Sequence, residues 1–298
     1  MRSFRQRAAF AAIPVLLAAP AAGAQTVPTP AVSVPIVAVH REVGLAAEGQ
    51  FLNYKENFPA APTGEATPHD RETGGAPGFA FMAEAMGDLG PVRHAYAAVR
   101  FRYNDGTTHY AGGAQFTGTP ISATDGLETE DVTVELGKGW LLTRRLLVTP
   151  VVQGGYHRWD RVLGYDEDYH HFFAGLAVHL DYALTPRLVA LGRLGWAETL
   201  SPRMTAGGIE VPSGDGGTVT TDADHFRLGT RPVWQAGLSL DYRLLRHVHL
   251  TGGVDFQRFG YGEDSTTVRY RGTPIARAVE PDSWTQQVVL STGLAWSF

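Results

Sequence analysis

Residues 284–298 read WTQQVVLSTGLAWSF and alternate strictly between two kinds of side chain. One set of alternate positions is bulky and apolar, with rings at its ends (Trp284, Trp296 and Phe298) and aliphatic residues between them. The other set is small or polar, as at Ser291. Only a β-strand turns a period of two into two separate faces. Rings at both ends of an apolar face are typical of a strand that crosses a lipid bilayer.

Nine earlier segments show the same alternation, which predicts ten strands in all. These strands are expected at about 42–54, 78–86, 92–103, 132–140, 146–156, 172–182, 188–196, 234–242, 248–256 and 284–298. Short turns (87–91, 142–145, 184–187 and 244–246) alternate with long polar segments (55–77, 104–128, 160–170, 202–225 and 260–282). The sequence therefore predicts an all-β fold, a transmembrane antiparallel up-and-down β-barrel of about ten strands, with short periplasmic turns and long extracellular loops.

Aromatic residues recur at both ends of these strands. The ends next to long segments carry Tyr156, Phe172, Trp196, Trp234, Phe256 and Trp284, and those next to short turns carry Trp140, Tyr182, Tyr242 and Phe298. From Phe172 to Tyr182 the strand advances by about 25 Å along the barrel axis, at ~3.3 Å per residue and a tilt near ~40°. That distance matches the apolar band of a membrane barrel, so we expect two aromatic girdles.

The last strand resembles the C-terminal signature strand of bacterial outer-membrane β-barrel proteins, which ends on an aromatic residue after alternating apolar positions. The resemblance implies an outer-membrane location, contact with lipid and lipopolysaccharide, and recognition by the barrel-assembly machinery through the segment from Trp284 to Phe298. In length and strand count the chain is also similar to the omptin proteases. That second resemblance goes no further, because a Trp-Thr-Asp-His-Ser-Ser-His run and a G-x-S-x-G segment are both absent.

The N-terminus predicts export from the cytoplasm. Residues 1–24 combine three arginines, an apolar run over 8–19 and the small residues 22–24, as a cleaved signal peptide does. Residues 25–41 contain three prolines and are expected to form an extended periplasmic lead-in. Residues 42–298 would then form the barrel, and the protein would reside in the bacterial outer membrane.

Composition narrows the range of functions. The chain has no cysteine, which excludes disulfide scaffolds and thiolate metal sites. Its 25 basic and 30 acidic residues give a net charge of −5, so nucleic acid is not an expected partner. No cofactor is predicted, and the sequence does not identify an extracellular ligand.

The faces expected to line the barrel interior carry many charges. They include Glu48, Glu84, Arg100, Arg102, Glu135, His179, Asp181, Arg193, Asp241 and Asp255. A ten-stranded barrel is close to the size at which side chains fill the lumen, and neighbouring charges of mixed sign favour pairing. We therefore expect a lumen plugged by paired charges and a structural or surface-interaction role. The alternative is a narrow, non-specific porin.

A third interpretation is an outer-membrane hydrolase, either a protease or a lipase. Asp131 and His157 are expected at the loop-side ends of neighbouring strands, and His171 begins the next strand, so an Asp–His pair could act as a general base. Such loose spacing arises easily by chance, and we assign no catalytic residue.

The nearby run YDEDYHH, residues 165–171, could hold Ca²⁺ or Zn²⁺. Its ligand spacing matches no known metal loop, and charge runs usually face water, so no metal site is predicted.

Overall fold

The computed structural model describes residues 35–57, 70–113, 119–162, 166–208, 210–212 and 217–298. The expected signal peptide, 1–24, and residues 25–34 of the expected lead-in lie outside these ranges. Within the described ranges, none of the helical structure has the length and apolar character that a membrane crossing requires.

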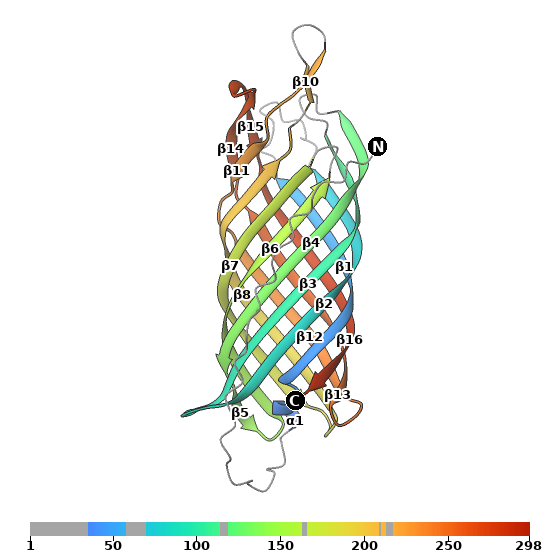
Figure 1. Cartoon of the computed structure of the whole chain (residues 1–298), viewed down its shortest axis with the longest axis vertical. Helices are drawn as coiled ribbons and strands as arrows, with labels where there is room; N and C mark the ends of the chain where they lie inside the picture. The colour runs from blue at the N-terminus through green and yellow to red at the C-terminus, as the bar shows by residue number, and fades with distance from the viewer. Residues whose placement is uncertain (1–34, 58–69, 114–118, 163–165, 209, 213–216) are drawn as a thin grey trace. The chain divides into compact units, whose positions relative to one another are not determined.

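Ten antiparallel strands close into a barrel, as predicted (Figure 1). They are β1 (Arg41–Asn57), β2 (Arg71–Leu89), β3 (Val92–Gly113), β4 (Pro120–Lys138), β6 (Leu146–Val162), β7 (Asp166–Ala183), β8 (Leu188–Ala206), β12 (Pro232–Arg243), β13 (Val248–Tyr261) and β16 (Asp282–Ser297). Strand β16 pairs with β13 on one side and with β1 on the other, from Glu42 opposite Ser297 to Asn57 opposite Asp282. The last strand of the chain therefore closes the barrel on the first.

Seven shorter elements complete the fold among the described residues. They are helix α1 (Pro35–Ala38) and the strands β5 (Trp140–Thr143), β9 (Glu210–Pro212), β10 (Thr218–Thr220), β11 (Asp224–Arg227), β14 (Asp264–Tyr270) and β15 (Thr273–Glu280), β14 and β15 forming a hairpin of their own. Strand β5 continues β4 after Gly139 and pairs with β6. We call the end with turns 90–91, 184–187 and 244–247 the short-turn end, and the opposite end, which carries the β14–β15 hairpin, the long-hairpin end (Figure 1).

The apolar faces predicted from alternation point away from the lumen. On β16, Leu290 is 51% exposed whereas its neighbour Val289 is 5% exposed. Of the ten predicted girdle rings, eight are exposed and the other two, Tyr156 and Trp284, are intermediate. The rings therefore lie on the outer surface, and their position at membrane interfaces stays a prediction.

The segments expected to be long loops are largely strand. Strands β3 and β4 remain paired up to Gly113 opposite Pro120, and β1 and β2 remain paired up to Lys55 opposite Arg71. Beyond the rings the outer face of the strands becomes polar. The alternation of apolar and polar residues that indicates a membrane strand is therefore absent from this part of the sequence. The inner face still buries large side chains such as Trp159 and Tyr169, which keeps the strands in register.

A proline within a strand predicts a bulge or a weak ladder, but Pro150 of β6 stays in continuous register with β7, opposite Val178. On the other side of β6 the ladder is interrupted: Val151 pairs with Gly137 of β4, and the next pair joins Val148 to Trp140 of β5. Proline has no backbone N–H to donate to a strand ladder. Pro150 lies at the gap in the pairing of β6 with β4 and β5.

Residues 35–40 differ from the expected extended lead-in. They form α1 and a turn that enter the lumen at the short-turn end (Figure 1). Ile36 and Val39 are buried in an apolar cluster with residues of the barrel wall that include Met86, Tyr96 and Leu147. Burial of apolar side chains outweighs the extended preference of the neighbouring prolines, so this segment covers the short-turn end of the lumen.

Candidate functional site

The lumen holds most of the buried polar side chains, and its contents change along the barrel axis. At the long-hairpin end, aromatic rings meet across it. Tyr54 of β1 lies 5.1 Å from Trp159 of β6, measured between ring centroids, and Tyr169 of β7 lies 5.7 Å from Tyr261 of β13. Strands β1 and β6 are separated around the wall by β2, β3 and β4. The contact between Tyr54 and Trp159 therefore spans the interior, and rings fill the lumen at this level.

Arg161 of β6 lies within this aromatic layer and is 2% exposed. Its Nε donates to Glu72 of β2 at 2.6 Å, and its Nη1 donates to Glu167 of β7 at 2.7 Å. The guanidinium also faces the rings of Tyr54, Tyr110 and Trp159, at 5.2, 5.5 and 5.7 Å from their centroids. One side chain thus links strands on different sides of the barrel through charge-assisted hydrogen bonds.

Carboxylates outnumber cations around Arg161. Burial raises the pKa of Glu56 to about 8, against the lowering effect of Arg161 3.7 Å away. Burial and the charge of Glu72 raise the pKa of Asp125 to about 6. Both residues lie beyond the ring positions, outside the segments predicted to span the membrane. At neutral pH the proton held by Glu56 reduces the repulsion that several buried carboxylates would otherwise exert on one another.

Seven of the ten predicted lumen charges meet in the central part of the barrel. Arg102 contacts Glu48 at 3.2 Å and also Asp255, which Arg100 approaches to 3.6 Å. On the other side of the lumen, Arg193 and His179 each contact Glu135 at 2.8 Å. Arg193 also donates to Gln153 and Gln235. These two groups border a cavity of about 180 Å³.

The other three predicted charges, Glu84, Asp181 and Asp241, lie at the short-turn end. His40, next to α1, bridges two of them, with Nδ1 3.1 Å from Glu84 and Nε2 2.9 Å from Asp181. The third, Asp241, contacts His249 at 2.7 Å. Sequence reasoning missed His40 because it precedes the first strand, where alternation gives no information about direction.

The three weak catalytic candidates come together but are enclosed. His157 Nδ1 lies 2.7 Å from Asp131 Oδ1, and the ring of His171 is 5.2 Å from that of His157. Both imidazoles are fully buried, and the ring of Phe259 packs 4.8 Å from one and 5.1 Å from the other. A general base must reach the proton that it removes, and this pair lies beneath the aromatic layer.

The described part of the acidic and histidine-rich run, 166–171, is a strand with alternating directions. Asp168 and His170 point outward and lie 3.0 Å apart. Arg158 of the neighbouring strand contacts Asp168 at 2.5 Å and Asp160 at 3.1 Å. All four side chains are about one-third exposed or less, and they form a paired polar surface just beyond the ring of Tyr156.

Comparison with known proteins identifies the fold. No family model and no curated protein matches the chain. Among solved structures, the chain is similar to the outer membrane protease OmpT from Escherichia coli, with a TM-score of 0.56 and 9% identity over 86% of this chain and 95% of that one.

Weaker likenesses include the toluene transporter TodX of Pseudomonas putida (TM-score 0.36, 10% identity, 87% and 90% covered) and Ail of Yersinia pestis (0.30, 7%, 86% and 99%). At these TM-scores, no conclusion is drawn from the likeness to TodX or to Ail. The likeness to OmpT shows a fold shared with outer-membrane barrels and says nothing about activity.

Proposed function

We propose that the protein is an integral outer-membrane β-barrel with a closed lumen and a structural or surface-interaction role. Its short-turn end faces the periplasm and its long-hairpin end faces the exterior. The barrel fold, the outward apolar faces and the aromatic residues at both ends of those faces support this placement. The last strand, from Trp284 to Phe298, serves in this proposal as the recognition segment for the barrel-assembly machinery.

The proposal of a closed lumen rests on side-chain contacts that cross the lumen at three successive levels along the barrel axis. They are the Tyr54–Trp159 ring contact, the Arg193–Glu135 ion pair and the His40–Asp181 ion pair. Each joins elements that are not neighbours in the wall. A narrow porin, the alternative, needs a continuous water path, and these contacts oppose one. The cavity of about 180 Å³ lies beside the Arg193–Glu135 ion pair and reaches the level of His40.

The surface for interaction lies at the long-hairpin end. Strand β15 pairs only with β14 among the described residues, and its other edge is open. Ile275, Arg277 and Val279 alternate along β15 and are all exposed. An open edge with exposed apolar side chains is the feature that strand-adding partners use. The outward carboxylates of Asp160 and Asp168 suit a second contact, with lipopolysaccharide through bridging divalent cations.

The hydrolase interpretation has less support than it had from the sequence. Asp131 and His157 form the expected hydrogen bond, but they lie inside the lumen. A substrate at the cell surface would have to displace the aromatic layer to reach them. The likeness to a protease does not alter this, because it extends to the fold alone.

Cysteine labelling tests the placement, since the chain contains no cysteine of its own. Ile275 on β15 and Leu184 in a short turn are matched in exposure, at 46% and 44%. On intact cells a membrane-impermeant maleimide should label the Ile275→Cys variant and spare Leu184→Cys. Opening the outer membrane should make both reactive. Labelling of Leu184→Cys alone would reverse the orientation, and equal labelling on intact cells would refute the membrane placement.

A further inference from the structure

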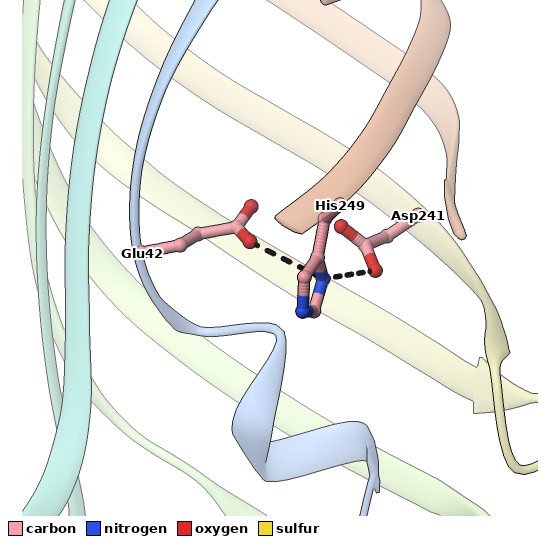
Figure 2. Close-up of side chains that lie close together, drawn as sticks. All are labelled: Glu42, Asp241 and His249. Atoms are coloured by element: carbon pink, nitrogen blue, oxygen red, sulfur yellow. Dashed lines mark hydrogen bonds and ion pairs between the residues drawn. The ribbon is translucent and has the colours of Figure 1, made fainter. Parts of the chain in front are cut away.

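Three buried side chains at the short-turn end converge on one point. Glu42 of β1, Asp241 of β12 and His249 of β13 point toward one another in Figure 2. Nδ1 of His249 lies 2.7 Å from an oxygen of Asp241 and 3.5 Å from an oxygen of Glu42. One ligating atom from each residue lies within 4.8 Å of the other two. The three atoms are close enough for one ion to be placed among them.

The strand order makes this convergence possible. Strands β1 and β13 both pair with β16, so Glu42 and His249 lie on either side of that strand. The β16 residue opposite His249 is Ala295, which is buried and small. A larger side chain there would separate Glu42 from His249. Asp241 lies on β12. His249 of β13 is paired with Arg243 of β12, and Asp241 is two residues before Arg243 on the same strand.

Two oxygen atoms of this group lack hydrogen-bond partners within the described part of the chain. Glu42 Oε2 and Asp241 Oδ2 are buried, and neither has a hydrogen-bond partner among the described residues. The two side chains are 3% and 1% exposed. Two ionised carboxylates beside a neutral imidazole would leave two buried negative charges, so without a metal ion burial favours a proton on one of these groups. The nearby His40 has two carboxylates of its own to neutralise, Glu84 and Asp181.

We propose that Glu42, Asp241 and His249 bind one divalent transition-metal ion of the Zn²⁺ class. Such an ion neutralises both carboxylates and takes the donors that are present, one imidazole nitrogen and two carboxylate oxygens. Tetrahedral Zn²⁺ with bonds of about 2.1 Å places neighbouring ligand atoms about 3.4 Å apart. The separation of 3.5 Å between Glu42 and His249 already fits, and the Asp241 oxygen, now 2.7 Å from Nδ1, has to withdraw by about 0.7 Å.

Coordination through Nδ1 replaces the hydrogen bond between His249 and Asp241. The Nδ1 proton of the neutral imidazole then moves to Nε2, and any proton held by a ligating carboxyl group is released to water. The fourth position is left to water from the central cavity, which Glu42 and Asp241 help to line. The bound ion ties the start of β1, and with it the segment of α1, to the β12–β13 hairpin. This site was not expected from the sequence, because Glu42 lies far along the chain from the Asp241–His249 pair. The proposal does not depend on the surface role.

Zn²⁺ binding to the purified barrel in detergent micelles tests the proposal. After removal of metal with EDTA and then of the chelator, isothermal titration should show one Zn²⁺ per chain. Metal analysis after gel filtration should give the same ratio. Asp241→Asn and His249→Gln should each weaken binding by at least 10-fold, since even outer-shell changes cost roughly 10–100-fold. An excess of Mg²⁺ should not compete, because Mg²⁺ prefers six oxygen ligands.

The exposed Asp168 and His170 pair, 3.0 Å apart, provides the matched control. The double variant Asp168→Asn, His170→Gln should bind Zn²⁺ as the unmodified protein does. Circular dichroism checks that each variant is folded, and Glu42→Gln replaces either ligand variant that is not. The proposal is overturned if the unmodified chain binds no stoichiometric Zn²⁺, if folded ligand variants retain full affinity, or if the control variant abolishes binding.

Discussion

Replacing Leu290 with arginine is expected to destabilise the barrel by about 2–4 kcal/mol, the cost of a basic side chain on the lipid face near the bilayer midplane. Leu290 is 51% exposed and lies six residues from both Trp284 and Trp296, so it is central in the predicted apolar band. Denaturant unfolding in liposomes, followed by tryptophan fluorescence, measures the change. The six tryptophans of the chain provide the fluorescence.

The adjacent residue gives the control for this change. Ser291 faces the opposite way, borders the central cavity and pairs in register with Glu48 of β1. Ser291→Arg therefore introduces the same charge beside a carboxylate in a polar space. We expect it to change the unfolding free energy by less than about 1 kcal/mol. Equal costs for the two substitutions would show that the lipid and lumen faces have been assigned wrongly.

Replacing Arg161 with methionine is expected to cost about 3–5 kcal/mol, the range for removing one partner of a buried ion pair. The variant leaves Glu72 and Glu167 buried without the guanidinium that they contact at 2.6 and 2.7 Å. Methionine keeps much of the apolar volume, so the loss reports on charge rather than on a cavity. The same unfolding measurement in liposomes applies.

Arg158, three residues earlier on β6, is the matched control. It points outward, is 25% exposed and contacts Asp160 and Asp168. Surface ion pairs contribute about 1 kcal/mol or less, so Arg158→Met should have a small effect. If Arg161→Met is as mild as Arg158→Met, water reaches the carboxylates around residue 161, and the lumen is open at this level.

Much of the fold could be predicted because a membrane strand leaves a strong pattern. Alternation over 284–298 indicated both the strand and its faces, and β16 has those faces. The short turns were recognisable because they interrupt that pattern with turn-forming residues. At the 90–91 turn, Gly90 has a φ of 57°, a conformation that glycine adopts at little cost.

The contacts inside the lumen could not be predicted in the same way. Alternation indicates that Arg193 and Glu135 face inward, but their meeting depends on barrel closure and on the register of the strands between them. The entry of His40 into the lumen left no periodic trace, because α1 is only four residues long. The strands beyond the rings were missed because outward residues there, such as Asp160, are polar, so the apolar alternation ends.

The closed lumen is tested most directly by current through planar lipid bilayers that contain the purified protein. A sixteen-stranded porin inserted in the same way serves as the positive control, since barrels of that size leave an aqueous channel. Recovery of the folded protein from the membranes confirms that it was inserted. We predict no stepwise current from the unmodified chain while the porin gives discrete steps. Reproducible steps from the unmodified chain would contradict the closed lumen and establish the pore.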